Sequence, residues 1–366
     1  MKKILITGYY GYSNSGDDAI LSSICKDIKQ LDSHEITILS NNPEETISEY
    51  DVNAIYRFKF NLVRAQIKTS DIVLMGGGSL LQDKTSTRSL FYYLFIIWYA
   101  KLHKKKCMLY ANGIGPINKA FNRRVTKWIV NKADVITLRE SLSNDELQAL
   151  GINKPKIYIT ADPVFNLPYV KVDVNEIFKN EGVDTTKPLA AVLFRNWLSS
   201  DSYIHKTAEL CDYITNQYDM HVVLIPMKYP TDIDISEEIL KSMKNKAFIL
   251  KQKHDVSEMI EIIGATKVVL SMRLHSLLYA AIQNVPMIGF IYDPKVEYYI
   301  RELNMYSAGD VSNFDLVNAK DIIDEIMRDY VKIQEQLAIK VGEVKKKAVE
   351  NREILGQLIK ELEDIK

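Results

Sequence analysis

The chain is poor in features that would assign it to several large classes of protein. It has three cysteines in 366 residues, Cys25, Cys107 and Cys211, and their odd number and wide spacing exclude a disulfide framework. A reducing cytoplasm is therefore the expected location. Lys+Arg and Asp+Glu number 47 each, so no excess of positive charge favours nucleic acid as a partner.

Long apolar runs are also missing. The longest, Leu90–Ala100, is too short to cross a bilayer, and residues 1–7 predict a first strand instead of a signal peptide. A basic cluster, Lys101–Lys106, follows that aromatic run. This combination is typical of peripheral contact with an anionic membrane, and the alternative is a buried helix with a solvated end. We keep contact between Leu90–Lys106 and the inner face of the membrane as a hypothesis.

Motifs for metals, nucleotides and nucleophilic catalysis are absent from the sequence. It has no H-E-x-x-H, no Cys/His cluster and no G-x-S-x-G. The glycines between Gly8 and Gly16 do not have the G-x-G-x-x-G spacing, and Ser40-Asn41-Asn42 lacks the acidic residue that would bind a ribose. We therefore expect neither a metal nor a cofactor.

The chain instead alternates short β-rich runs with helical periods, which predicts parallel βαβ units. An apolar content of 47% is that of an ordinary globular protein. Composition changes between Pro163 and Pro188, where prolines and a glycine gather. The expected organisation is an N-terminal Rossmann-like domain, a linker, a second Rossmann-like domain and a C-terminal helical extension broken near Gly342, at residues 1–170, 171–187, 188–317 and 318–366.

The most informative stretch is Val268–Ser276, in which a predicted strand runs directly into a helix. It delivers Arg273 and His275 to the carboxyl end of the strand, where ligands bind in open parallel sheets. Ser271 and Ser276 offer caps for the helix, whose first amides attract anions. An arginine, an imidazole and a helix start suit an anionic substrate that needs proton transfer. A buried arginine beside a packed histidine is the structural alternative.

Glycine-rich segments follow three strands of the first half, and each predicts a loop. They are Gly8–Asp18, which contains Tyr9, Tyr10 and Tyr12 as stacking faces for sugars as well as Asn14, Gly16 and Asp17; Gly76-Gly77-Gly78-Ser79 followed by Gln82; and Asn112–Pro116. A helix cap is the alternative role for Asp17 and Asp18. Three such segments at one sheet edge favour close approach to a ligand.

Further polar residues follow other predicted strands. Four cations share the carboxyl edges with His275, namely Arg139, Arg195, Arg273 and Lys295, and Asp162 lies at the same kind of position. Each alone is typical of a salt bridge or a cap. Together they suit a small substrate with phosphate and carboxylate groups.

These motifs, read in order, resemble the polysaccharide pyruvyl transferase family. The matching strings are Gly8-x-x-Gly11-x-x-x-Asn14-x-Gly16-Asp17-Asp18, Gly76–Asp83, Gly113–Pro116, Ala161-Asp162-Pro163 and Ser271–His275. The likeness spans about residues 1–300 and is greatest to bacterial enzymes that pyruvylate a secondary cell-wall polymer for S-layer anchoring. The family's third turn residue is longer than Asp18.

The resemblance implies two Rossmann-like domains facing each other across a cleft, as in GT-B glycosyltransferases. The donor would be phosphoenolpyruvate, and the product a 4,6-O-ketal on N-acetylmannosamine of a lipid-linked amino-sugar disaccharide. The family's R-L-H signature maps onto Arg273, Leu274 and His275, and further cations map onto Arg139 and Lys295. These cations and Arg195 would hold the donor, and His275 would transfer the proton. The glycine-rich loops and Asp162 would hold the acceptor.

Two other functions remain open from the sequence. A GT-B glycosyltransferase that uses a nucleotide sugar would need a carboxylate for the ribose, for which Asp293 or Glu297 qualifies. A non-catalytic module that binds glycans or anions would not depend on His275.

Overall fold

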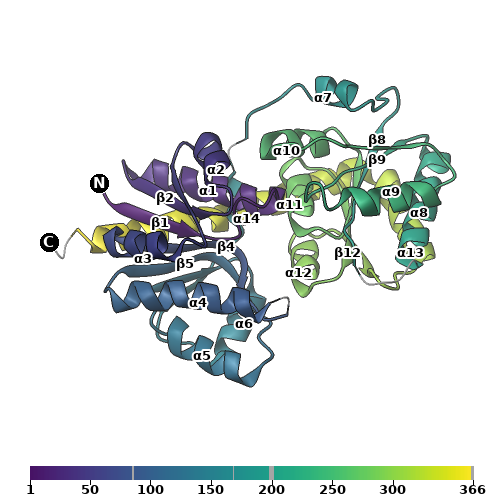
Figure 1. The fold of residues 1–366 in the computed structure, drawn as a ribbon. Coiled ribbons are helices and arrows are strands. Elements are labelled where there is room, and N and C mark those ends of the chain that lie inside the picture. The colour runs from purple at the N-terminus through teal and green to yellow at the C-terminus, as the bar shows by residue number, and fades with distance from the viewer. Residues whose placement is uncertain (85, 168, 198–201, 364–366) are drawn as a thin grey trace. The chain divides into compact units, whose positions relative to one another are not determined.

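The computed structural model describes residues 1–84, 86–167, 169–197 and 202–363, and the chain forms two compact units. Unit 1 comprises residues 1–13, 17–168 and 344–366, and unit 2 comprises residues 14–16 and 169–343. Each unit is built on one parallel sheet with helices on both faces (Figure 1). The expected α/β fold with two Rossmann-like sheets and a C-terminal helix is confirmed. The end of the expected extension, residues 364–366, lies outside the described residues.

Unit 1 has a seven-stranded sheet of order β3-β2-β1-β4-β5-β6-β7. This order changes direction at β1, as in doubly wound sheets, so the carboxyl ends of β1 and β4 flank the point where ligands usually bind. The strands are β1 (Lys3–Thr7), β2 (Glu35–Ser40), β3 (Asn53–Tyr56), β4 (Ile72–Leu81), β5 (Lys106–Ile114), β6 (Val135–Leu138) and β7 (Lys156–Ile159).

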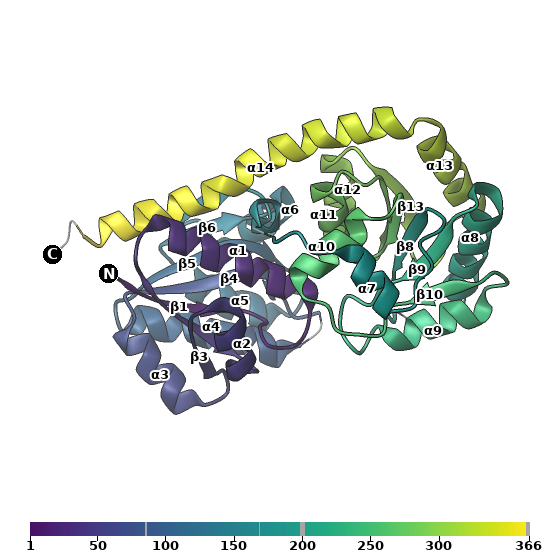
Figure 2. The same ribbon diagram turned by 90° about the horizontal axis from the view of Figure 1, so that it is seen from above.

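Helices cover both faces of this sheet. One face packs against α3 (Phe60–Thr69), α4 (Thr87–Leu102), α5 (Ala120–Val130) and α6 (Ser141–Leu150), whose apolar residues share a core with the strands. On the other face lie α1 (Ser15–Leu31) and the later part of α14 (Tyr330–Glu361), side by side in Figures 1 and 2. Gly356 of α14 allows this approach, since a Cβ there would lie 3.0 Å from Leu31. The unit also contains α2 (Pro43–Tyr50) and the short 3-10 helix η1 (Pro163–Asn166).

Two glycine segments expected to be loops belong instead to long central strands. β4 continues through Gly76-Gly77-Gly78 to Leu81, and β5 continues through Asn112 and Gly113 to Ile114. The two strands pair along this length, with irregular register between Gly78 and Leu81. The prediction was wrong because glycine lowers β propensity, whereas pairing on both sides supplies the missing stability.

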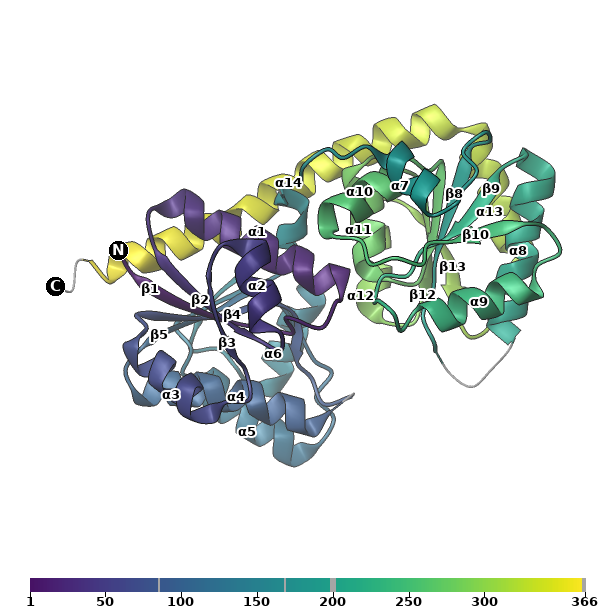
Figure 3. The ribbon, with the colours of Figure 1, turned by 45° about the horizontal axis from the view of Figure 1, so that its top comes forward.

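Unit 2 has a six-stranded sheet of order β10-β9-β8-β11-β12-β13. The strands are β8 (Leu189–Leu193), β9 (His221–Leu224), β10 (Ala247–Ile249), β11 (Val268–Ser271), β12 (Met287–Ile291) and β13 (Tyr306–Asp310). One face packs against α8 (Ser202–Tyr218), α9 (Ile233–Ser242) and α13 (Leu316–Arg328). The helices α10 (Val256–Gly264), α11 (Leu274–Ile282) and α12 (Pro294–Glu302) lie on the other face (Figure 3).

The second half holds two elements that the sequence did not predict. α7 (Val174–Asn180) falls within the expected linker and begins at Asp173, whose side chain accepts a hydrogen bond from the Asn175 amide. β13 is an edge strand of sequence YSAGD, in which the last three residues have low β propensity. α14 shows no break at Gly342, and the helix boundary lies instead at Asp329. Within the described ranges, no helix combines the length and the apolar character that crossing a membrane requires.

Asp83, just after β4, illustrates how a motif residue organises unit 1. It is 8% exposed, and its carboxylate accepts hydrogen bonds from the amides of Asn118 and Lys119, at 2.8 and 3.0 Å, and from Asn122 Nδ2 at 2.8 Å. Burial alone would raise the pKa of Asp83, but these bonds outweigh it and lower the pKa below its ordinary value. Asp83 therefore connects the end of β4 to the start of α5.

We predict that Asp83→Asn destabilises the protein by about 2 kcal/mol at neutral pH, because hydrogen bonds to a charged acceptor are lost. A lowered pKa stabilises the fold at pH values above that of the unfolded carboxyl, about 3.9, and this contribution disappears as pH falls through the lower native value. The stability difference from wild type should therefore shrink below about pH 4. Denaturant titrations at several pH values would measure it, with the exposed Asp145→Asn as control. A difference independent of pH would contradict the assignment.

Candidate active site

The carboxyl ends of four neighbouring strands in unit 2 carry most of the predicted donor-site residues. In the order β9-β8-β11-β12, the segments that follow these strands contain Asp232, Arg195, Arg273 with His275, and Lys295. This is the edge at which open parallel sheets bind ligands. Unit 2 thus brings together Arg195, Arg273, Leu274, His275 and Lys295 among the predicted residues.

Arg273 forms a buried ion pair that the sequence did not reveal. One terminal nitrogen of its guanidinium contacts both carboxylate oxygens of Asp232, which is 2% exposed at the start of α9. Asp232 also accepts a hydrogen bond from the Lys228 amide at 3.0 Å. The sequence marked Asp232 only as a helix start after Pro230, since nothing local shows that a strand end 41 residues later faces it.

The electrostatic surroundings of Arg273 are mixed. Burial lowers the pKa of Arg273, Asp232 acts in the opposite direction, and the positive charge of nearby Arg195 lowers it further. An arginine remains protonated through such a shift. Two neighbouring guanidinium groups repel each other, and a bound anion would relieve that repulsion.

The start of α11 differs from the sequence prediction. Arg273 itself occupies the cap position, and no side chain caps the helix there. The Ser271 hydroxyl accepts from the Arg273 amide at 2.9 Å, and the Ser276 hydroxyl donates to the Arg273 carbonyl at 2.7 Å. The two serines therefore hold the Arg273 backbone between them, and they do not cap the helix as predicted.

Gly16 and His275, predicted from separate motifs, are neighbours in unit 2. A Cβ on Gly16 would lie 2.2 Å from His275 Nδ1, which is far inside van der Waals contact. The adjacent Ser15 is held in place by its amide, which donates to the Met227 carbonyl at 3.2 Å, and by Tyr279, whose hydroxyl lies 3.0 Å from the Ser15 hydroxyl. Asn14 forms an antiparallel bridge with Lys228. The Asn14–Gly16 segment thus packs directly against the imidazole.

The remaining cations of unit 2 lie at neighbouring strand ends. Lys295 is 8% exposed in the first turn of α12, where its amide donates to Asp293 at 2.9 Å. Arg195 lies 5.9 and 5.8 Å from the rings of Trp197 and Tyr292, and these rings contact each other edge to face. The two aromatic residues form a wall beside Arg195 that the sequence analysis missed.

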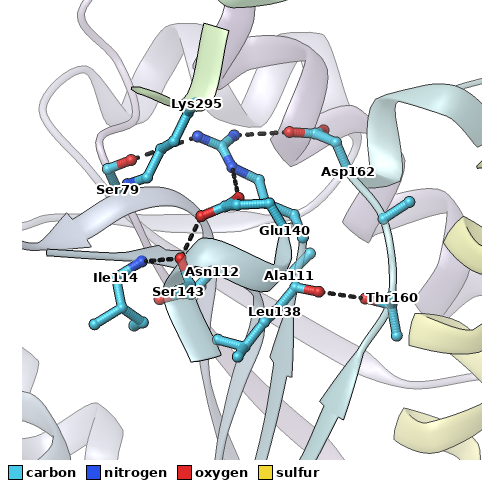
Figure 4. Close-up of polar contacts among 12 residues, drawn as sticks. Ser79, Ala111, Asn112, Ile114, Leu138, Glu140, Ser143, Thr160, Asp162 and Lys295 are labelled. Carbon is cyan, nitrogen blue, oxygen red and sulfur yellow. Dashed lines mark hydrogen bonds and ion pairs between the residues drawn. The ribbon is translucent and has the colours of Figure 1, made fainter. Parts of the chain in front are cut away.

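Arg139 lies in unit 1, in a buried network of charges drawn in Figure 4. Its guanidinium is 4% exposed and pairs with Asp162 at 2.7 Å and with Glu140 at 3.2 Å, and both carboxylates are fully buried. A third bond reaches the Ser79 hydroxyl at 3.4 Å. The structure thus brings Arg139, Asp162 and Ser79 together. The carboxylates of Asp162 and Glu140 neutralise the charge of Arg139.

The glycines of β4 make room for the protein's own side chains. A Cβ would lie 2.2 Å from the Tyr10 hydroxyl at Gly76 and 2.3 Å from Ile20 at Gly77. At Gly78 the nearest atom is an Asp17 carboxylate oxygen, at 3.4 Å. Close packing of Tyr10 and α1 therefore explains Gly76 and Gly77, whereas Gly78 has a positive φ of 74°, which favours glycine there. Gln82 follows the end of β4 and is partly buried.

The three tyrosines after β1 divide into two groups. Tyr10 is 1% exposed, so its prediction as a stacking face for a sugar was wrong. Tyr9 and Tyr12 stack on each other with ring centroids 4.1 Å apart and remain partly exposed.

Asp17 and Asp18 lie in the first turn of α1, where carboxylates interact favourably with the helix dipole. Among the described residues, no group of three or more His, Cys, Asp and Glu side chains is arranged to hold a metal ion.

We predict that Gly16→Ala displaces the His275 ring and destabilises the protein by about 1–3 kcal/mol, because the added methyl group overlaps Nδ1. Ring chemical shifts of His275 and the thermal midpoint would measure both effects. Gly342→Ala is the matched control, since nothing lies within 4 Å of that position in α14. It should leave the His275 signal unchanged and stabilise the helix by about 0.5–1 kcal/mol. An unshifted His275 signal in Gly16→Ala would contradict the packing.

Known proteins resemble this chain in sequence and in fold. The amylovoran biosynthesis protein AmsJ of Erwinia amylovora is 20% identical over 313 residues, which cover 80% of this chain and 72% of that protein. The solved structure of Anabaena HepE in complex with UDP-glucose aligns with a TM-score of 0.67 at 11% identity, covering 99% of this chain and 100% of HepE. UDP-GlcNAc 2-epimerase of Neisseria meningitidis, bound to UDP-GlcNAc, aligns with a TM-score of 0.64 at 12% identity, covering 96% and 99%.

The structural matches establish the architecture shared by GT-B glycosyltransferases and these epimerases, and at such low identity they establish the fold alone. A family model described as polysaccharide pyruvyl transferase matches residues 14–294. This range begins at the segment that packs against His275 and ends just after β12, so it contains both motifs that the structure brings together in unit 2. The chain therefore belongs to the polysaccharide pyruvyl transferase family.

Proposed function

We propose that this protein transfers the pyruvyl group of phosphoenolpyruvate to a sugar of a lipid-linked cell-wall polymer precursor, forming a ketal and releasing phosphate. The observation that supports it most is the gathering of Arg195, Arg273, His275 and Lys295 at the carboxyl edge of one sheet. Phosphoenolpyruvate carries a phosphate and a carboxylate on three carbons, which suits cations spaced over neighbouring strand ends.

In this proposal the donor binds in unit 2. Arg273 offers a planar guanidinium whose position is fixed by Asp232, and Arg195 and Lys295 complete the positive surroundings. The first amides of α11, next to Leu274, point toward the same edge and favour negative charge. Preorganised charge of this kind stabilises a departing phosphate group.

His275 is the proposed acid and base. Ketal formation breaks the bond between C2 of phosphoenolpyruvate and the phosphate oxygen and forms two bonds from C2 to sugar oxygens. Of the two hydroxyl protons, one goes to C3, which becomes a methyl group, and the other leaves with phosphate. An imidazole can move such a proton near neutral pH. Gly16 fixes the ring by its close approach.

The acceptor residues are proposed in unit 1 and in the segment that precedes α1. Gly76, Gly77, Gly78 and Ser79 lie within the central strand β4, and Gln82 follows it. Asp17 lies close to Gly78, and Asn14 precedes Gly16. Arg139 and Asp162 act as positioning residues in this proposal, because their charges already pair with each other. The proposed acceptor is N-acetylmannosamine, modified at O4 and O6, in an amino-sugar disaccharide carried by a lipid.

A glycosyltransferase that uses a nucleotide sugar is the second candidate, favoured by the UDP-sugars bound to structurally similar proteins. The carboxylates suited to a ribose have other partners here. Asp293 caps α12 by accepting from the Lys295 amide, and Glu297 pairs with Arg301 on the same helix. This arrangement and the family membership both favour the pyruvyl transferase.

The test is to incubate the protein with phosphoenolpyruvate and candidate disaccharides and to follow the acceptor by mass spectrometry. We expect a gain of one pyruvyl unit with loss of one water, together with release of phosphate. His275→Asn should lower kcat by about 10²–10⁴-fold, since proton transfer is lost. The exposed His205→Asn serves as the matched control and should retain full activity.

Two results would overturn the proposal. One is release of a nucleotide from a sugar nucleotide without any reaction of phosphoenolpyruvate, which would establish the glycosyltransferase. The other is full activity of His275→Asn, which would leave the imidazole without a role in proton transfer.

A further inference from the structure

Acidic residues are absent from two long segments of unit 1. Residues 52–70 contain four Lys/Arg and residues 84–133 contain eleven, and neither segment has a single Asp or Glu. The whole chain has 47 residues of each sign, so this imbalance is local. The two segments form β3, α3, α4, β5 and α5, and the three helices cover one face of the sheet in unit 1 (Figures 1 and 3).

Large apolar side chains are exposed on the same helices. Tyr56 at the end of β3, Phe58 just after it, and Phe60 and Leu62 at the start of α3 are 39–47% exposed. The end of α4 and the outer side of α5 add Leu102, Phe121 and Trp128, which are 57–66% exposed. Apart from Leu102, the aliphatic residues of α4 are buried, so the predicted contact helix Leu90–Lys106 offers mainly its aromatic side and its basic end.

We call these exposed side chains, together with the rings of α4 that they contact, the aromatic face. Ring contacts run from Phe58 to Tyr92 at 5.8 Å, from Tyr92 to Phe60 at 6.4 Å and from Phe60 to Phe95 at 6.0 Å. They continue along α4 to Trp98, Tyr99 and His103, and Phe91 stacks on Phe121 of α5. The aromatic face therefore extends over α3, α4 and α5.

Arg57 fixes one end of the aromatic face. Its guanidinium lies 4.6 Å from the Tyr92 ring and 5.3 Å from the Phe58 ring. It also donates to the Gly8 carbonyl at 2.7 Å and to the Tyr93 hydroxyl at 3.2 Å. A buried arginine with this many contacts keeps the exposed rings in place before any partner binds, which reduces the entropy lost on binding.

We propose that the aromatic face docks onto the surface of an anionic phospholipid bilayer. Exposed cations, including Lys59, Arg64, Lys104, Arg124 and Lys127, would attract anionic head groups. Tryptophan and tyrosine rings are favoured at the level of the head groups. Phenylalanine and leucine side chains gain by leaving water for the acyl boundary, and they offer no hydrogen bonds to the bases or phosphates of a nucleic acid. The proposal concerns membrane binding alone and needs no substrate. Membrane binding can therefore be tested independently of the proposed pyruvyl transfer.

The test is flotation of the full chain with vesicles of phosphatidylcholine, with and without phosphatidylglycerol. We expect binding only to the anionic vesicles and weakening by salt. The triple variant Lys59→Gln, Arg64→Gln, Arg124→Gln should bind roughly 100-fold more weakly, at about fivefold for each cation. Phe58→Ser with Phe60→Ser, and separately Trp128→Ser, should lower binding while thermal melting shows an intact fold.

Matched controls come from the exposed side of α14. Lys332→Gln with Lys346→Gln and Lys360→Gln removes the same charge, and Val331→Ser with Ile339→Ser removes exposed apolar side chains, on a helix that contributes no residue to the aromatic face. Both should bind as wild type does. Equal losses in the controls, equal binding to neutral vesicles, or displacement by single-stranded RNA at matched phosphate concentration would each overturn the bilayer assignment.

Discussion

A buried positive charge needs a fixed negative partner, and the pairing of Arg273 with Asp232 meets this need in unit 2. The pair connects the end of β11 to the start of α9 across β8, so it holds together the carboxyl edge of the sheet. The positive charge of Arg195 acts on the same guanidinium, so two arginines lie near each other at this edge. This arrangement is the basis on which we propose that the edge binds an anionic donor.

A second constraint is steric. His275 lies at the start of α11 and Gly16 near the N-terminus of the chain. The His275 ring takes the space that a side chain at position 16 would need. Tyr279, one turn after His275, donates to the Ser15 carbonyl at 2.8 Å and so fixes the distance between the two segments. A glycine at position 16 is thus part of the geometry of the imidazole. Two motifs separated by more than two hundred residues are thus coupled by one steric contact.

The sequence was sufficient for features that depend on local pattern. Alternating strands and helices predicted the parallel sheets, and strand ends predicted where Arg195, Arg273, His275 and Lys295 would gather. Features that depend on contacts distant in sequence were missed or assigned wrongly. Asp232 does begin a helix as predicted, but its ion pair with Arg273 was missed. Tyr10 is buried, and the glycines after Met75 were expected in a loop although they pair within β4. No local propensity encodes which side chain fills the space above a glycine.

The zero net charge of the chain illustrates the same limit in electrostatics. Equal totals of acids and bases argued against a polyanionic partner, yet acids are excluded from segments 52–70 and 84–133. A field at a surface depends on charges within about 10 Å, the screening distance at moderate salt, and not on the total over the molecule. The balancing carboxylates lie elsewhere in the sequence. A local cationic face is therefore compatible with electroneutrality, and its partner has to be inferred from the exposed side chains that surround the cations.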